Sequence, residues 1–256
     1  MKKYYFPPVG FGFFYQLGVL MAIPKHENYE LYGSSGGAIV CMISLLKEKD
    51  LNIQTILHIS EKIRKKMYTN LFPYLDHFLK EIQIIIDSYE NEYIERKLSK
   101  IYIEVTEIKN LFQFESKFKQ PKTIDELQHL VKASCYIPLF FYHQNPIYYA
   151  IGEKKFCDGF FGNYSNIPSD FIKINSYSYA TLIPLTSNDF HSMFQKGTMY
   201  HFEQNPQKMT IFLFLKILGK IFTDSIIYIR KIGIKIENFC LFTKSIKNGR
   251  MYNLLQ

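Results

Sequence analysis

The pentapeptide Gly-Ser-Ser-Gly-Gly at positions 33–37 is the most informative stretch of this sequence. It follows a short apolar run, Tyr29–Tyr32, and precedes a longer one, Ala38–Leu46, so it predicts a strand, a tight turn and a helix. In a G-x-S-x-G turn the strand and the helix pass so closely that the flanking residues must be glycine. The central serine is then held in a strained backbone conformation with its hydroxyl pointing outward. Ser35 has glycine at both required positions, and Ser34 does not.

The predicted helix after Ser35 favours a chemical role for this serine. The N-terminus of a helix attracts negative charge, and its unused N–H groups can stabilise a nucleophile and the oxyanion that it creates. The same residues are also compatible with an ordinary glycine-serine turn. A serine hydroxyl is a poor nucleophile until a base takes its proton, so a nucleophile here requires a base elsewhere in the chain.

The composition limits the class of protein. The chain has 256 residues, enough for one large domain or two small ones, and its 47% hydrophobic and 21% charged residues are typical of a globular protein. The net charge of +8 favours attraction to nucleic acid or to an anionic membrane surface. The lysines and arginines are spread out, however, and form no block that would follow a phosphate backbone. We therefore expect a membrane or lipid partner and no nucleic acid.

The cysteines and the N-terminus indicate the compartment. The four cysteines lie in apolar surroundings without a CxxC pair, which favours reduced core residues over disulfides or a zinc site. The apolar stretch after Lys2 and Lys3 is broken by two prolines and several glycines, and no A-x-A site follows, so it does not predict a signal peptide. We expect a cytoplasmic protein, which is compatible with peripheral binding at membranes.

The first fifty residues predict a β-α-β-α order. A strand is expected within Tyr4–Val9 and a helix over Phe13–Ile23, before the strand and helix that flank the pentapeptide. This alternation is typical of a parallel sheet with helices on both faces. Residues 52–100 are expected to be mostly helical, with a break at Pro73, and residues 101–108 alternate like a strand.

The remaining chain predicts shorter elements. Thr123–Glu126 is a capping box that opens a helix, which Pro138 must end. Further strands are expected within residues 139–142, 147–151 and 171–174. Residues 209–236 are strongly apolar but carry six charged side chains, too many for a membrane span. This segment is expected to lie at a membrane interface or to pack on the sheet.

Two arrangements compete for the role of the base. One is a Ser-Asp-His triad in the chain order of α/β-hydrolases, with Asp158 or Asp170 as the acid and His191 or His201 as the base. Against this triad, Ser35 comes much earlier than the usual α/β-hydrolase nucleophile, and neither histidine lies in a recognisable motif.

The other arrangement is a serine–aspartate dyad. Asp158 follows the short apolar step Phe156-Cys157 and directly precedes Gly159. A carboxylate in partly apolar surroundings at a strand end has a higher proton affinity and is a better base than in water. An Asp-Gly pair is also common in ordinary turns, so this pair alone carries little weight.

These residues together resemble motifs of the patatin-like phospholipase family, in its animal-type branch. Residues 33–37 match the nucleophile elbow of the family, and Asp158-Gly159 resembles its catalytic Asp-Gly element. Residues 133–141 are similar to its A-S-x-x-x-P-x-x-F segment, and residues 166–168 to its N-x-P element. Gly10-Phe11 and residues 15–20 are similar to its first loop and helix. The likeness runs from about residue 6 to 168.

The resemblance implies a three-layer α/β/α sandwich around a central, mainly parallel sheet. Residues 1–205 would form the catalytic domain, and residues 206–256 an apolar and basic helical extension, packed on the domain or on a membrane surface. Ser35 would be the nucleophile of a lipid acyl hydrolase and Asp158 its proton acceptor. Gly33, Gly37 and Gly159 would be motif glycines. The substrate would be a phospholipid or an acylglycerol, at a membrane or lipid-droplet surface, with no cofactor and no metal.

The chain departs from the family in its first loop. In an alignment without gaps from Gly18 backward, the glycine triplet whose N–H groups form the oxyanion hole falls on Pro8-Val9-Gly10, and proline has no N–H to donate. A shifted alignment places Gly10 and Gly12 there instead. Gly10, Phe11 and Gly36 are the expected donors. Loss of one oxyanion donor typically costs on the order of 10²–10³ in turnover. The alternative function is therefore a catalytically impaired lipid-binding or scaffold protein that keeps the fold. Phe160, after Gly159, is larger than the residue often found there and would narrow the site.

Overall fold

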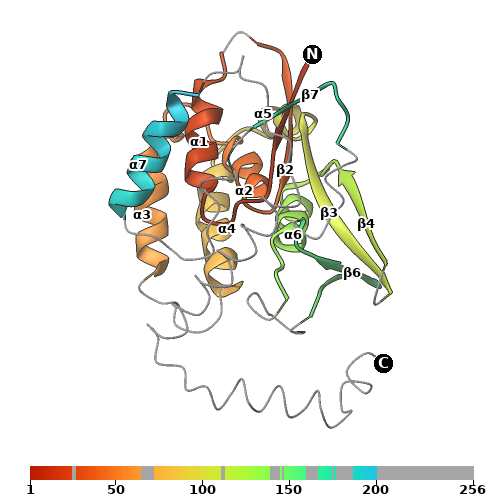
Figure 1. Cartoon of the computed structure of the whole chain (residues 1–256). Helices are drawn as coiled ribbons and strands as arrows, with labels where there is room; N and C mark the ends of the chain where they lie inside the picture. The colour runs from red at the N-terminus through yellow and green to blue at the C-terminus, as the bar shows by residue number, and fades with distance from the viewer. Residues whose placement is uncertain are drawn as a thin grey trace.

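The chain folds as an α/β protein with a mixed sheet (Figure 1). The computed structural model describes residues 1–24, 27–64, 72–110, 113–138, 145, 147–159, 167–174, 176 and 187–200. The strands are β1 (Lys2–Phe6), β2 (Tyr29–Ser34), β3 (Ile101–Asn110), β4 (Gln113–Lys119), β5 (Tyr149–Ile151), β6 (Lys154–Cys157) and β7 (Phe171–Lys173). The described helices are α1 (Phe13–Ala22), α2 (Gly36–Ile43), α3 (Ile53–Arg64), α4 (Phe72–Ile86), α5 (Asn91–Leu98), α6 (Ile124–Ser134) and α7 (Ser187–Thr198).

The prediction of a mainly parallel sheet is confirmed only in part, because the sheet is mixed. Its strand order is β5-β6-β3-β2-β1-β7, and β4 also pairs with β3. The pairs β1–β2, β2–β3 and β1–β7 are parallel, whereas β3–β4, β3–β6 and β5–β6 are antiparallel. Strands joined by only two residues, as β3–β4 and β5–β6 are, pair antiparallel because a parallel crossover needs a much longer connection.

Strand β3 organises the sheet because it is paired along both edges. Glu104 pairs with β4 and with Ser34 of β2, while Thr106 pairs with β4 and with Cys157 of β6. Strand β4 therefore lies along one edge of β3, and β2 and β6 share the other edge, one after the other. Because β2 is parallel to β3 and β6 is antiparallel to it, these two strands point toward each other. Their last residues meet beside Val105.

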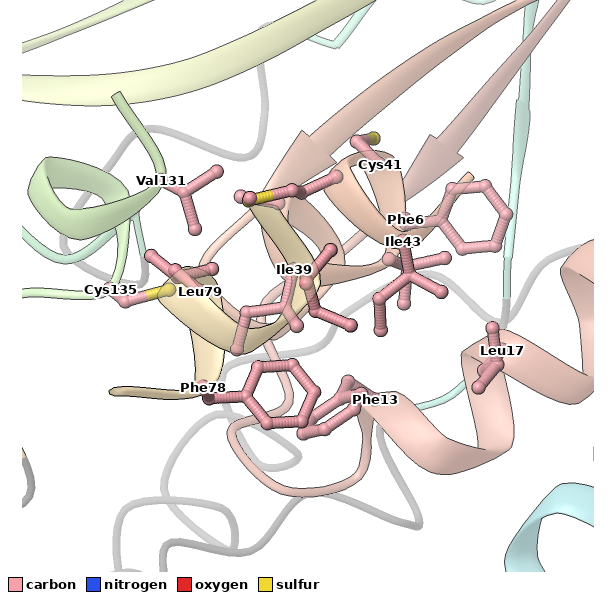
Figure 2. Packing of buried hydrophobic residues seen from close by; sticks show 14 of the residues in the cluster. Phe6, Phe13, Leu17, Ile39, Cys41, Ile43, Phe78, Leu79, Val131 and Cys135 are labelled. Carbon is pink, nitrogen blue, oxygen red and sulfur yellow. The ribbon is translucent and has the colours of Figure 1, made fainter. Parts of the chain in front are cut away.

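The main hydrophobic core lies between one face of the sheet and the helices. The sheet contributes Tyr4, Phe6, Leu31, Ile103 and Val105, which alternate with residues of the opposite face as a pleated strand requires. Every residue of α2 is buried, since α1, α4 and α6 surround it above the sheet. Figure 2 shows side chains of these helices converging there; those labelled include Phe13, Leu17, Ile39, Phe78, Leu79 and Val131.

The opposite face of the sheet carries a layer of aromatic side chains. Tyr5, Tyr32 and Tyr102 are neighbours across β1, β2 and β3, and the Tyr32 and Tyr102 rings stack with centroids 4.6 Å apart. Phe118, Phe171 and Ile167 pack against this layer. Each described helix contributes to the core on the other face, so the described residues form one helical layer and one sheet layer.

Several predicted elements are confirmed close to their expected bounds. Helix α1 begins at Phe13 as expected, and α6 begins after Thr123, whose hydroxyl accepts a hydrogen bond from the Glu126 N–H at 3.1 Å. Pro73 lies in the first turn of α4, where proline is tolerated because that N–H has no partner within the helix. Strands β4 and β6 and helix α7 were not expected. The strand expected within residues 139–142 and the extension 206–256 lie outside the described residues.

The cysteines of the described part agree with the expectation of reduced core residues. Cys41, Cys135 and Cys157 are free and buried, and burial raises the pKa of the Cys157 thiol to about 12. Cys240 lies outside the described residues. Among the helices that the structure describes, none combines the length and apolar character that crossing a bilayer requires.

Candidate active site

The elbow at Ser35 is built by backbone packing that tolerates only glycine. Ser35 has φ 51° and ψ −119° and is the single non-glycine residue with positive φ in the described ranges. A Cβ on Gly33 would lie 2.4 Å from the Gly37 carbonyl oxygen, and one on Gly37 would lie 2.0 Å from the Phe6 carbonyl oxygen. Such approaches are far inside van der Waals contact. The lack of a Cβ at Gly33 and Gly37 lets β1, β2 and α2 pack this closely, and the positive φ falls on Ser35 between them.

Ser35 and Asp158 form a direct hydrogen bond in this structure. The Ser35 Oγ donates to Asp158 Oδ2 at 2.6 Å, and the two residues are only 4% and 1% exposed. Residue 35 follows β2 and residue 158 follows β6, the two strands that meet end to end beside β3. The topology therefore brings together two residues that are 123 positions apart in the chain.

Three consecutive residues at the end of α6 hold both members of this pair. The Ser35 N–H donates to Ser134 Oγ at 2.8 Å, and Cys135 Sγ donates to the Ser35 carbonyl oxygen at 3.2 Å. The Asp158 N–H donates to the Tyr136 carbonyl oxygen at 2.8 Å. The segment 134–136 thus fixes the serine backbone on both sides and the aspartate backbone as well. The Ser35 N–H is consequently not free to bind an oxyanion.

Gly159 lets the aspartate turn approach the elbow. A Cβ at this position would lie 1.9 Å from Ser34 Oγ. A larger residue after Asp158 would therefore require either the Ser34 side chain or the aspartate turn to move.

A small apolar pocket opens beside Ser35. Its wall contains all three expected oxyanion donors, Gly10, Phe11 and Gly36. Gly10 has φ 56°, and a Cβ on Gly36 would lie 2.5 Å from the Gly10 carbonyl oxygen, so the first loop packs directly on the elbow. Gly36 is the first residue of α2, where intrahelical hydrogen bonds leave N–H groups unused. Among the described residues, the wall does not include Pro8, the residue without an N–H.

The pocket is lined largely by side chains that no sequence motif specifies. Cys135 and Ile137 occupy variable positions of the 133–141 segment, and Phe13, Ile39, Tyr74 and Leu75 lie outside the motifs. They come from α1, α2, α4 and the end of α6, and each of those helices has many apolar residues of the same kind. Only their packing around Ser35 distinguishes these six. The cavity volume is about 30 Å³, room for one or two water molecules.

The described residues do not assemble the alternative triad. Asp170 forms a 2.8 Å ion pair with Lys3, and the His191 ring contacts Gln195 on the same helix at 3.0 Å. A triad needs an imidazole between the serine and the carboxylate, and the direct Ser35–Asp158 hydrogen bond leaves no room for one. His201, Phe160 and Asn166 lie outside the described residues.

A second buried carboxyl group lies on the aromatic face of the sheet, near the elbow. Glu104 is the β3 partner of Ser34 and is 3% exposed, and its Oε2 accepts a hydrogen bond from the Tyr5 hydroxyl at 2.7 Å. Burial raises the pKa of Glu104 above its ordinary value, while the hydroxyls of Tyr5 and Ser34 act in the opposite direction. Nothing in the sequence distinguished this glutamate from the other carboxylates.

Comparison with known proteins finds neither a family model nor a curated protein that matches this chain. Within the described ranges, no group of three or more His, Cys, Asp or Glu side chains is arranged to hold a metal ion.

Proposed function

We propose that this chain is a serine carboxylic-ester hydrolase that acts on lipid acyl esters, with the Ser35–Asp158 dyad and the fold of a patatin-like phospholipase. The observation that carries this proposal is the 2.6 Å hydrogen bond between a serine at a strained strand–helix elbow and a buried carboxylate. The proposed fold is a three-layer α/β/α sandwich.

The proposed reaction proceeds through an acyl-enzyme. Asp158 accepts the proton from Ser35 Oγ as this oxygen attacks the ester carbonyl, and the N–H groups of Gly10, Phe11 and Gly36 stabilise the resulting oxyanion. Collapse of the tetrahedral intermediate breaks the ester bond, and the alcohol leaves with the proton. Water then attacks the acyl-enzyme, with Asp158 as the base, and releases the fatty acid and Ser35. The apolar wall of the pocket favours an aliphatic acyl chain as the bound group.

A second candidate function is supported by the size of the pocket. A volume of about 30 Å³ does not hold an acyl chain, so substrate binding requires wall side chains such as Phe11 and Tyr74 to move. If they do not move, the chain is a catalytically impaired lipid-binding or scaffold protein. In that case it binds vesicles but releases no fatty acid and reacts with no fluorophosphonate.

The two functions are separated by an activity assay on mixed phospholipid and triglyceride vesicles. Wild type is expected to release fatty acid, and Ser35→Ala and Asp158→Asn to release none above background. Asp170→Asn is the matched control, because it changes an aspartate whose partner is Lys3, and it should keep wild-type activity. Labelling of wild type but not of Ser35→Ala by a fluorophosphonate probe would identify the nucleophile. Equal fatty-acid release by wild type, Ser35→Ala and Asp158→Asn would refute the hydrolase.

A further inference from the structure

A polar pocket lies at the opposite end of the parallel strands from Ser35. Its wall includes Tyr29 at the start of β2, Ile101 at the start of β3 and the last turn of α5. Since β2 rises about 3.3 Å per residue from Tyr29 to Ser34, the two sites are roughly 17 Å apart. The cavity volume is about 260 Å³, several times that of the pocket beside Ser35.

Three cationic side chains line this pocket. Arg96 and Lys97 belong to α5, Lys100 follows two residues after it, and Lys100 Nζ donates to the Asn28 side-chain oxygen at 2.9 Å. Within the described part of the chain, neither Arg96 nor Lys97 forms an ion pair. Burial lowers the pKa of Lys97, and the positive charges of Arg96 and Lys100 lower it further. The three cations therefore repel one another in the absence of an anion.

The surrounding groups do not neutralise these cations. Glu27 also lines the pocket, but its carboxylate already accepts hydrogen bonds from Lys2 and from the Tyr4 hydroxyl, both at 2.5 Å. The C-terminal end of α5 contributes the equivalent of about half a negative charge. A positive excess at a polar cavity is the electrostatic arrangement that binds a multiply charged anion.

We propose that this pocket binds the phosphate group of a phosphate monoester, with Arg96, Lys97 and Lys100 as its partners. A phosphate monoester carries about two negative charges and three acceptor oxygens, which suit three cationic donors better than a single carboxylate does. The cavity is large enough for a small alcohol moiety beside the phosphate. The phosphate comes either from a soluble metabolite or from a lipid headgroup. The proposal does not depend on the chemistry at Ser35.

The test is a titration of the full chain with glycerol 3-phosphate by isothermal calorimetry. Wild type is expected to bind, and Lys97→Gln and the double variant Arg96→Gln/Lys100→Gln to bind at least about tenfold more weakly. Lys122→Gln removes the same charge from an exposed position before α6 and is the matched control. Ser35→Ala should bind like wild type, which separates this site from the proposed active site.

A second arm identifies the source of the phosphate. The same variants are sedimented with phosphatidylcholine vesicles that contain or lack phosphatidic acid. Binding only to phosphatidic acid vesicles, and its loss in Lys97→Gln, would assign the site to a lipid headgroup. The proposal is overturned if wild type binds neither ligand, if Lys97→Gln binds as tightly as wild type, or if Lys122→Gln weakens binding equally.

Discussion

The two ends of the parallel strands are built on different physical principles. At the carboxyl end, glycines pack against backbone atoms, one serine has positive φ, and buried hydrogen bonds fix the backbone of the proposed dyad. At the amino end, a wider cavity is lined by three cations, and burial together with the charges of Arg96 and Lys100 lowers the pKa of Lys97. The carboxyl end therefore depends on close packing, and the amino end depends on the balance of charge. Substitutions at the two ends should distinguish the contribution of packing from that of charge.

The largest loss of stability is expected at Gly37, where the backbone packing is tightest. Gly37→Ala places a Cβ 2.0 Å from the Phe6 carbonyl oxygen, so β1 or α2 must shift, and we expect the free energy of unfolding to fall by about 3 kcal/mol. Gly152→Ala is the control, since its φ is 59° with no atom within 4 Å of the added carbon, and it should cost only roughly 1 kcal/mol. Urea unfolding followed by circular dichroism measures both. Equal losses would contradict the steric explanation.

A smaller effect is expected from the hydrogen bond that holds the nucleophile backbone. Ser134→Ala removes the acceptor of the Ser35 N–H, and we expect kcat of the proposed hydrolase to fall roughly 10- to 100-fold with KM little changed. Ser116→Ala removes a β4 hydroxyl that lies 3.1 Å from Thr106 Oγ1 and is hydrogen-bonded to neither Ser35 nor Asp158. Each variant should lose about 1 kcal/mol of stability. If both variants lose activity equally, the loss of stability, and not the position of the Ser35 backbone, controls turnover.

At the amino end of the strands, a substitution should raise stability rather than lower it. Because the pKa of Lys97 is lowered in the folded state, the unfolded chain binds this proton more tightly, and the folded state gains stability as the pH rises toward 10.5. Lys97→Gln should therefore raise the melting temperature at neutral pH without ligand. Added salt should reduce the difference by screening the repulsion. A lower melting temperature for Lys97→Gln at low salt would show that the three cations do not repel one another.

The smallest effect on stability is expected at Glu104, a buried carboxyl group whose pKa is raised by burial. The raised pKa of Glu104 means that the folded state holds its proton when the unfolded chain has lost it, so stability falls as the pH rises above 4.5. Glu104→Gln keeps an acceptor for Tyr5 and should be more stable than wild type at pH 8, with the difference vanishing near pH 4.5. Thermal unfolding across this range measures it. Glu153→Gln, at an exposed turn position, should show no such trend.

Local patterns predicted most of the elements that surround the elbow. The glycines at 33, 36 and 37, the capping box at Thr123 and the apolar periodicity of α1 depend on neighbours a few residues away, and sequence displays those directly. Strands β4 and β6 were missed because β4 carries mostly exposed polar residues and β6 has only four residues. The direction of these strands made the sheet mixed.

The residues that support the proposed dyad were harder to predict. Ser134 and Tyr136 were visible as part of a motif, but their contacts with Ser35 and Asp158 depend on how the end of α6 packs against the elbow. The three cations of the second pocket are separated by at most four positions, yet a helix end rich in lysine and arginine is common. Only the cavity that they enclose distinguishes them.

The amino-acid sequence alone determined that a serine stands in a turn where the chain passes too closely for side chains on its neighbours, because that constraint is local. The tertiary structure decided that Asp158 lies 2.6 Å from this serine. The reason is that β2 and β6 run toward each other along one edge of β3, and strand direction within a sheet is set by pairing over long sequence distances.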